Sequence, residues 1–471
     1  MTKPPQPNLD SVTTIREDGS RPFLHPADVR GRFTWLRRLA ALALLVIYVL
    51  LPWIPVNGYP AVFLDVAERR FHFFGLTLAT QDLWLAFFLV AGLAFALFYI
   101  TAFFGRIWCG WTCPYTVFLE HLYRRVERWI DGDAPARRKL DDAPWTASKI
   151  FKRVLKHGIF VVISALIAHV FLSYFVSIKQ LYLWMQGPPK QHLFAFGVVL
   201  FLTGALYFAF SWFREQFCII ICPYGRLQSA LTDDNTVTIG YDKKRGEPRG
   251  KLGTEGAGDC INCMRCVQVC PTGIDIRNGL QLECIGCAAC VDACDAIMTK
   301  VGRPKGLVRY GSLNDLTGGR TRFLRPRTIV YSLFALVGLT AFAFSLSTLK
   351  PMRVLAKRMQ GAPFFMGDGV VRNQFTLQVI NKRHEASSYQ IDLTKAPAGM
   401  HMNGAEGAVT VAPLGAVGKT VIVTISEKDY TGKDEITFTV RELREGGSSI
   451  TQTVEFLGPD LRFFKNRPTP P

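Results

Sequence analysis

Five uncharged apolar stretches recur along the first three quarters of the chain. Each approaches or exceeds the length of about 20 residues that a helix needs to cross a bilayer core of about 30 Å. They are Leu39–Ile54, Leu83–Phe104, Ile159–Ile178, Leu193–Phe213 and Thr328–Leu349. We therefore predict five transmembrane helices, and Trp35 and Trp53 flank the shortest of them as interfacial anchors. Its long polar lead and the lack of a small-residue cleavage site favour a retained helix over a cleaved signal peptide.

From about Met352 onward, apolar and polar residues alternate, a pattern typical of half-buried strands. The predicted strands are Gln374–Asn381, Ser388–Leu393, Ala408–Ala412, Thr420–Ser426, Ile436–Leu443 and Ser449–Leu457. Short strands separated by Gly- and Lys-containing turns predict an antiparallel sandwich of the immunoglobulin type. This region contains no cysteine, so the disulfide typical of that fold is absent.

The basic residues predict how the helices are oriented. Lys and Arg number seven before Leu39, eleven in Gly105–Gly158 and seventeen in Arg214–Arg327, against two in each of the two intervening loops. By the positive-inside rule, the N-terminus and the basic segments lie in the cytoplasm and the C-terminal region lies outside. The formal net charge of +18 is then explained by topology and contact with anionic lipid, and we predict no nucleic-acid partner.

Eight of the twelve cysteines form two similar runs between the fourth and fifth apolar stretches. In each run, three cysteines are spaced two residues apart and a fourth follows after a longer gap. In two-cluster ferredoxins the fourth cysteine binds the other cluster. The runs therefore predict two [4Fe–4S] clusters. Their expected ligands are Cys260, Cys263, Cys266 and Cys294 for the first cluster, and Cys284, Cys287, Cys290 and Cys270 for the second.

Structural zinc is the alternative, because it also favours pairs of cysteines two residues apart. It gives no reason for two complete triplets, each followed by a fourth cysteine, and clusters are the favoured interpretation. Asp295 stands where the bacterial ferredoxin pattern has proline. Proline shapes the turn and supplies no ligand, so this departure concerns the surroundings of the cluster.

The other four cysteines form an internal repeat. Cys109-x-x-x-Cys113-Pro-Tyr follows the second apolar stretch, and Cys218-x-x-x-Cys222-Pro-Tyr follows the fourth. We call these the first and second CxxxCP motifs. Proline can occupy the first turn of a following helix, which leaves Cys113 and Cys222 near its N-cap, where the helix dipole favours a thiolate.

Two such pairs brought together make a four-sulfur site that suits a soft ion such as Cu(I). Buried packing residues are the alternative, since free cysteine is among the most buried residue types. The repetition in the same phase favours a redox or metal role, and which of these two roles applies is left open.

Other potential ligands are weaker. His169 lies inside the third apolar stretch, where a neutral imidazole bound to a helix carbonyl explains it as well as a functional role does. His121 and His192 carry still less information. The Met400-His401-Met402 run offers copper-type ligands, but an accidental combination in a short exposed loop is the favoured interpretation.

These patterns predict a membrane α-helical bundle of five transmembrane helices, an inserted α+β ferredoxin-like domain with two [4Fe–4S] clusters, and a C-terminal all-β immunoglobulin-like sandwich. The predicted parts are a cytoplasmic tail (1–38), a four-helix membrane region with the first CxxxCP motif (39–213), a cytoplasmic segment with the second motif and both clusters (214–327), the fifth helix (328–349) and a periplasmic β domain (350–471).

This layout resembles the FixG/RdxA/CcoG family of cytochrome c oxidase accessory proteins, and the resemblance covers nearly the whole chain. It implies a multi-pass protein of the bacterial inner membrane that serves assembly of cbb3-type oxidase. It also implies an oxidoreductase activity of the cupric-reductase type, with copper at Cys109, Cys113, Cys218 and Cys222 as a hypothesis. Assembly factors of that oxidase or copper chaperones are the implied partners. The electron donor and homo-oligomer formation are left open.

The expected mechanism is a relay from a soluble donor or a membrane quinol through the two clusters to copper at the CxxxCP thiolates. A non-enzymatic copper chaperone or assembly scaffold is one alternative. The other is a quinol-oxidising conduit to a periplasmic reductase, for which the sequence offers no extracytoplasmic haem motif.

Overall fold

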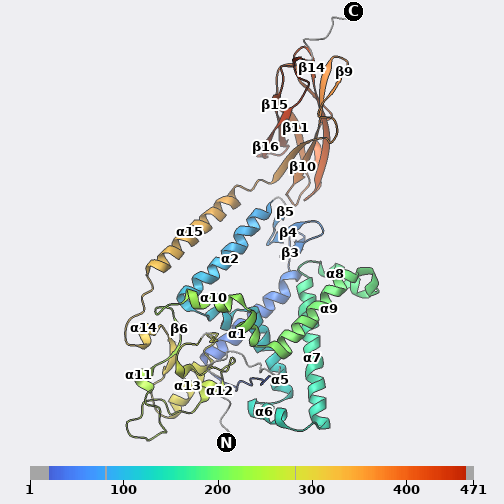
Figure 1. Ribbon diagram of the computed structural model, residues 1–471. Helices are drawn as coiled ribbons and strands as arrows, with labels where there is room; N and C mark the ends of the chain where they lie inside the picture. Colours follow the sequence, from blue (N-terminus) through green and yellow to red (C-terminus); the bar gives the residue numbers. More distant parts are fainter. Residues whose placement is uncertain (1–20, 80–81, 282, 463–471) are drawn as a thin grey trace, which may run out of the picture. The chain divides into compact units, whose positions relative to one another are not determined.

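The computed structural model describes residues 21–79, 82–281 and 283–462 (Figure 1). The chain divides into two compact units, Met1–Ala343 and Phe344–Pro471. The first unit holds all twelve cysteines, and the second unit is a β domain.

Within the described residues, five helices are long and apolar enough to cross a membrane. They cover Arg32–Trp53, Trp84–Phe104, Ala147–Leu172, Pro189–Phe213 and Pro326–Ser347. Their main helical elements are α1 (Arg32–Leu50), α2 (Leu83–Phe104), α7 (Ala147–Leu172), α9 (Leu193–Phe208) and α15 (Pro326–Ser347). The described residues contain as many long apolar helices as the sequence predicted, but several of their bounds are different.

The first helix begins seven residues before the predicted Leu39 because a distant side chain caps it. Gly31, at the N-cap, has no side chain to offer. The buried carboxylate of Asp292 instead accepts the backbone N–H groups of Phe33 (3.2 Å) and Thr34 (2.7 Å). These groups would otherwise lack partners at the helix start. The charge-free stretch therefore marked only the later part of the helix.

The third span was predicted as Ile159–Ile178 and is wrong at both ends. Helix α7 starts at Ala147, where Thr146 caps it by accepting the N–H of Lys149 at 3.3 Å. Its basic first turns are stable because Lys149 and Lys156 are buried against oxygen partners. The helix ends at Leu172, and the chain turns before a separate helix, α8 (Ile178–Gln186), begins.

The segment between α1 and α2 contains two small sheets that the sequence analysis did not predict. A two-stranded sheet pairs β1 (Pro55–Val56) with β2 (Tyr59–Pro60). A three-stranded sheet orders β3 (Val62–Asp65), β4 (Arg70–Phe73) and β5 (Leu76–Ala79). Alternation of apolar and polar residues over a few positions could have indicated these strands. Strands of four residues, however, are at the lower limit of what such periodicity can identify.

The remaining helices of the first unit connect the spans and cover the cysteine-rich segment. They are α3 (Ile107–Trp111), α4 (Pro114–Phe118), α5 (Arg124–Ile130), α6 (Ala134–Asp142), α10 (Pro223–Leu231), α11 (Lys243–Gly246), α12 (Arg265–Gln268), α13 (Ala289–Lys300) and α14 (Leu313–Leu316). Three π-helical turns are η3 (Leu119–Tyr123), η5 (Ala209–Phe213) and η6 (Phe217–Ile221), and 3₁₀ turns are η1 (Leu51–Trp53), η4 (Pro189–His192) and η7 (Ile276–Asn278). An antiparallel pair, β6 (Thr238–Tyr241) with β7 (Val308–Gly311), closes the cysteine-rich segment.

The second unit is a two-sheet antiparallel sandwich, as the alternating pattern predicted. One sheet has the order β12-β14-β10-β8 with β9 also on β10, and the other has the order β13-β11-β15-β16. The strands are β8 (Met352–Arg358), β9 (Phe365–Gly367), β10 (Val370–Asn381), β11 (Ser387–Lys395), β12 (His401–Asn403), β13 (Val409–Val411), β14 (Ala416–Ser426), β15 (Asp434–Glu442) and β16 (Ser449–Phe456). Alternate residues of both sheets, such as Phe375 and Phe438, meet in one apolar core.

Candidate metal centre

Four cysteines line a small cavity in the cysteine-rich segment. Cys260 and Cys263 come from the loop before α12, Cys266 from α12 and Cys294 from α13. The rest of the lining is largely apolar and includes Met298, Leu307 and Val308. We call this space the first cavity. The first predicted ligand set gathers around it.

A second small cavity is lined by Cys270, Cys284, Cys287 and Cys290. Cys266 lines both cavities, so the two spaces adjoin. The four cysteines of the second cavity come from both sequence runs, in the grouping inferred from the spacing. The assignment of individual sulfurs as ligands stays a prediction.

The two cysteine loops have the same backbone form. In each loop, the second residue after the first cysteine has positive φ, Asn262 (54°) and Gly286 (67°), and so does the fourth, Met264 (59°) and Ala288 (58°). Asn and Gly tolerate this left-handed region, whereas Met264 and Ala288 are strained there by about 1–3 kcal/mol each. Backbone strain repeated at matching positions indicates a conformation kept for a bound group.

The cysteine environments also fit iron–sulfur clusters. Burial raises the pKa of Cys266, Cys284 and Cys294 to about 12. Backbone N–H groups oppose this shift, that of Gly286 at Cys284 and that of Val308 at Cys294. Bare thiolates are therefore destabilised in these apolar cavities, and bound iron would supply the missing positive charge. N–H donors aimed at sulfur are also a means of tuning cluster potential.

Asp295, the departure from the ferredoxin pattern, has a structural role. Its carboxylate accepts the backbone N–H of Gly306 at 2.8 Å. This bond ties the middle of α13, which carries Cys294, to the turn before β7. A proline could shape the local turn but could not make this contact.

The two CxxxCP motifs are a structural repeat as well as a sequence repeat. After α2, Gly105 has φ 54° and ψ −126°, and after η5 the matching residue, Arg214, has φ 48° and ψ −127°. Cys113 and Cys222 are then the N-caps of α4 and α10, each followed by proline at the first helical position. The predicted caps are confirmed.

The tyrosine of each motif binds the end of the span that belongs to the other motif. Tyr115 donates to the carbonyl of Arg214 at 2.6 Å, and Tyr224 lies 2.6 Å from the hydroxyl of Thr101 in α2. Arg106, three residues before the first motif, donates to the carbonyl of Gly225, the residue after the second motif. The tyrosines of the repeated Pro-Tyr pair therefore hold the two halves of the repeat together.

The four CxxxCP thiols lie near one another. Burial raises the pKa of Cys218, and the nearby thiols of Cys113, Cys109 and Cys222 raise it further. Burial also raises the pKa of Cys109 to about 11, although Gln228 donates to its sulfur at 3.5 Å. The structure therefore brings the four thiols of the sequence repeat near one another, and their role as copper ligands stays a prediction.

No three His, Cys, Asp or Glu side chains converge on a common point for a single metal ion in the described part of the chain. This holds for the eight ferredoxin-type cysteines too, because each cysteine ligand of a [4Fe–4S] cubane binds a different iron at a separate corner. The CxxxCP thiols of the described chain therefore lie near one another without forming a ready-made three-ligand site for one metal ion.

The first CxxxCP motif packs directly on the loop of the second cavity. A Cβ placed on Gly110 would lie 2.5 Å from the carbonyl oxygen of Ile285 and 2.9 Å from the backbone of Cys287. Cys109 and Cys287 share one buried apolar cluster. Gly110 is therefore the point of closest approach, where only hydrogen fits.

Aromatic residues reinforce this contact. The indole N–H of Trp111 donates to the hydroxyl of Tyr310 at 3.1 Å, and that hydroxyl donates to the carbonyl of Gly286 at 2.6 Å. The Phe33 ring packs edge-on against Tyr310 at 5.5 Å. A continuous hydrogen-bonded path thus joins the motif to the second cavity.

Alanine at Gly110 is expected to separate these two elements. The added methyl group meets backbone atoms, which cannot move aside like a flexible side chain, so unfolding stability should fall by about 1–3 kcal/mol. The thermal unfolding midpoint of the purified chain measures this loss. Gly158→Ala in α7 is the control, because its Cβ would meet nothing within 4 Å and helix propensity should leave stability equal or higher. Equal midpoints for both variants would contradict the close approach.

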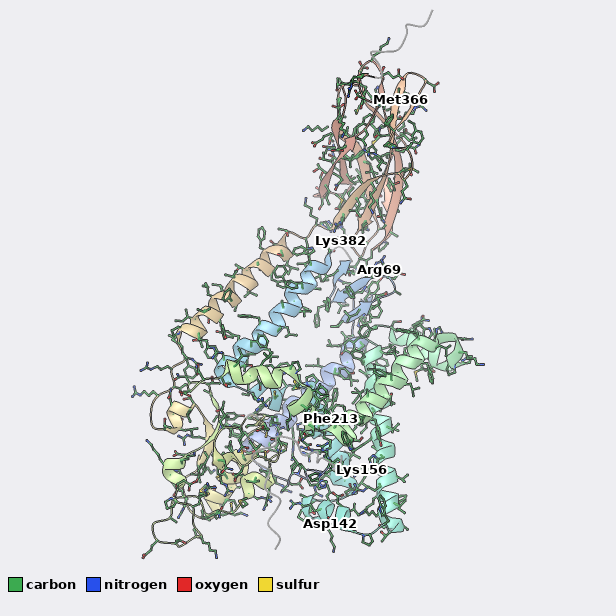
Figure 2. The ribbon with its side chains drawn as sticks, in the orientation of Figure 1. Arg69, Asp142, Lys156, Phe213, Met366 and Lys382 are labelled. Carbon is green, nitrogen blue, oxygen red and sulfur yellow. The ribbon has the colours of Figure 1, made fainter. Side chains whose placement is uncertain are left out.

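A buried ionic network, which the sequence analysis missed, surrounds the ends of the spans. Arg214 donates to Glu127 at 3.0 Å, and Arg124 donates to Glu215 at 3.0 Å and to the carbonyl of Pro271 at 3.1 Å. Burial alone would raise the pKa of Glu127, but the surrounding cations hold it at about 2. Figure 2 labels Phe213, where η5 ends, and Lys156, which ion-pairs with Asp131. Since Pro271 follows Cys270, the network anchors the second cavity to the helices.

The histidines and the Met-His-Met run have structural explanations. His169 bonds the carbonyl of Ala165 at 2.7 Å, and His192 stacks on Trp184 at 4.3 Å. Burial lowers the pKa of His121 to about 4, which keeps its ring neutral. The Met-His-Met run includes the edge strand β12 instead of the predicted exposed loop; Met400 and Met402 pack on the core and His401 is exposed.

Comparisons with known proteins agree with this arrangement. Residues 213–313 match the model of a 4Fe-4S dicluster domain, residues 84–132 that of a 4Fe-4S binding domain, and residues 342–459 that of an IG-like fold at the C-terminal of FixG. Protein RdxA of Cereibacter sphaeroides is 36% identical over 444 residues, which cover 89% of this chain and 92% of that protein. The chain belongs to the FixG/RdxA family.

Two further relatives support the same family. Nitrogen fixation protein FixG of Rhizobium meliloti is 35% identical, with 83% of each chain covered. Protein RdxB of Cereibacter sphaeroides is 37% identical, with 82% of this chain and 85% of that protein covered. A crystal structure of a FixG-related protein from Vibrio parahaemolyticus aligns with 23% of this chain at 19% identity, with a TM-score of 0.21. This FixG/RdxA-family chain is therefore an iron–sulfur protein of the electron-transfer type.

Proposed function

We propose that this FixG/RdxA-family chain passes single electrons from two [4Fe–4S] clusters to Cu(II), which is reduced at the CxxxCP thiols and delivered as Cu(I) to an assembling cbb3-type oxidase. The observation that carries the proposal is the contact of Gly110 with Ile285 and Cys287. It brings a quartet of thiols against the loop of a cluster site.

Eight cysteines would hold the clusters. The first cluster would be held by Cys260, Cys263, Cys266 and Cys294, and the second by Cys270, Cys284, Cys287 and Cys290. Bound clusters supply a store of single electrons. The protein contributes the apolar lining, the N–H donors to sulfur and the packing that excludes water around Cys287.

The CxxxCP thiols would receive the copper. Soft sulfur ligands prefer Cu(I) over Cu(II), so binding at Cys109, Cys113, Cys218 and Cys222 favours one-electron reduction of the ion. Arg106 lies close enough to oppose the rise in the pKa of Cys218, and a cation there stabilises a thiolate formed when copper arrives. Each Cu(II) takes up one electron and leaves as Cu(I).

We place this protein in the bacterial inner membrane, with the clusters and the N-terminus in the cytoplasm and the β domain in the periplasm. Support comes from the five long apolar helices and from the Lys and Arg residues that concentrate in alternate segments between them. Oxidase assembly factors or copper chaperones would receive the Cu(I).

Anaerobic stopped-flow mixing of the reduced protein with Cu(II) tests the proposal. The clusters should reoxidise, with one Cu(I) formed for each electron lost and without release of iron. Reoxidation that is absent, or that is matched by iron release, would contradict reduction at the thiols and favour a copper-binding scaffold.

A second function for the thiol quartet has an observation in its favour. The model of a 4Fe-4S binding domain matches residues 84–132, whose cysteines are Cys109 and Cys113. The quartet would then hold an iron–sulfur centre of its own and extend the electron path instead of binding copper.

A further inference from the structure

The two cluster sites differ in their access to solvent. Of the twelve cysteines, all of which the structure describes, only Cys263 is exposed. It lines the first cavity, where its neighbour Asn262 is exposed as well. The loop of the second cavity packs against the first CxxxCP motif. The exposed thiol of Cys263 therefore marks the edge of the first cavity as a place that an external protein can approach.

A basic strip lies beside the exposed edge. The segments 243–259 and 300–305 carry eight basic and three acidic residues, a net charge of +5. Hydrogen bonds attach both segments to the Cys260 loop. The backbone N–H of Gly250, next to Lys251, donates to the carbonyl of Cys260 at 3.2 Å. The guanidinium of Arg245 donates both to the carbonyl of Lys305 and to the carboxylate of Asp259.

The ends of this strip are free to interact. Lys251, Lys300 and Lys305 are exposed, and no carboxylate among the described residues lies within ion-pair distance of them. Exposed cations without internal partners raise the local concentration of a negatively charged partner and speed its association.

Charged groups lie near both cavities. Near the first cavity, the carboxylates of Asp275 and Asp295 oppose a further negative charge, whereas the guanidinium of Arg277, which lines the cavity, favours one. Arg106 and the buried Arg37 lie near Cys284 and Cys287, where they stabilise one. The shared lining residue Cys266 makes the intervening step short.

We propose that the edge of the first cavity at Cys263, together with the basic strip beside it, is the docking surface for an acidic protein that carries single electrons. The donor loses one electron and the first cluster gains it, with no proton or bond exchanged. The electron then moves to the second cluster, beside Gly110. The docking proposal rests on the proposed function in one respect: both require that the clusters store electrons.

The test measures cluster reduction in the full-length chain, without copper. Reduced acidic [2Fe–2S] ferredoxin is the protein probe and reduced methyl viologen the small-molecule probe, mixed anaerobically at low ionic strength. Lys251→Glu/Lys305→Glu should slow reduction by ferredoxin by about tenfold or more, because long-range attraction becomes repulsion. Reduction by methyl viologen should change little, which shows that the clusters are intact.

The matched control is Arg138→Glu/Lys139→Glu on α6, which changes the net charge by the same amount at exposed positions away from the cysteine segment. It should leave the ferredoxin rate within about twofold, and added salt should abolish the difference between the variants. If both variants slow reduction by ferredoxin equally, the effect depends only on net charge, and the docking surface is overturned. A lysine variant that keeps its ferredoxin rate but loses binding to vesicles containing anionic phosphatidylglycerol would assign the strip to lipid and overturn the proposal.

These outcomes are independent of copper chemistry. If Cu(II) fails to reoxidise the clusters but the lysine variant slows the ferredoxin reaction, the proposed function fails and the docking surface stands. If Cu(II) reoxidises the clusters but the lysine variant reacts with ferredoxin at the parental rate, the docking surface alone is overturned.

Discussion

Serine at Cys270 is expected to remove the same cluster as serine at Cys290, although the two cysteines belong to different sequence runs. Cys270 lines the second cavity together with Cys284, Cys287 and Cys290. Losing one of two cubanes should halve the iron and acid-labile sulfide content of either variant. The electron paramagnetic resonance signal of the reduced protein should simplify to that of a single cluster.

Double variants make this prediction specific. Cys270→Ser/Cys290→Ser should lose no more iron than either single variant, because both changes affect one site. Cys263→Ser/Cys290→Ser should lose nearly all the iron, because Cys263 lines the other cavity. If Cys270→Ser instead adds to the loss in Cys290→Ser and not to that in Cys263→Ser, each run keeps its own fourth cysteine and the crosswise assignment is wrong.

The second large effect is expected at the CxxxCP motifs. Cys109→Ser/Cys222→Ser removes one sulfur from each motif and should abolish tight copper binding while the iron–sulfur absorbance persists. A hydroxyl is a much harder ligand than a thiolate, so serine cannot hold Cu(I) in its place. Copper, iron and sulfide are quantified on the same anaerobic preparation after loading with Cu(I) and desalting.

Thr112→Ser is the matched control for this variant. It lies between the two cysteines of the first motif, keeps all twelve thiols, and can preserve the bond from the hydroxyl to the carbonyl of Trp108. This control should bind copper like the parent. A fall in iron content in Cys109→Ser/Cys222→Ser would contradict the copper assignment and place the four thiols in an iron–sulfur centre, as the family model over residues 84–132 favours.

Much of the architecture could be predicted because it depends on short, contiguous sequence patterns. Hydropathy identified five spans, and alternation identified strands such as β11, β14 and β16. The cysteine spacing grouped the ligands because a cubane constrains three nearby positions and a turn. The phase of the CxxxCP repeat predicted Cys113 and Cys222 as helix caps, since proline at the first helical position specifies that geometry.

What the patterns could not supply were contacts between residues far apart in the chain. The start of α1 depends on Asp292, more than 250 residues away, so no local signal marked Arg32 as its first residue. Likewise, the sequence analysis placed the charged residues Lys149 and Lys156 in a loop. They belong to α7 because both side chains are buried against oxygen partners.

The sequence by itself determined which residues can serve as spans, strands and sulfur ligands, because periodicity and spacing are local properties of the chain. Only the tertiary structure decided that Gly110 of the first CxxxCP motif meets the backbone of Cys287 and that Tyr115 and Tyr224 cross between the repeats. It also decided that Cys263 is exposed, while the other eleven cysteines are buried or half-buried. These features arise when distant segments pack and exclude water. The electron path that we propose depends on them.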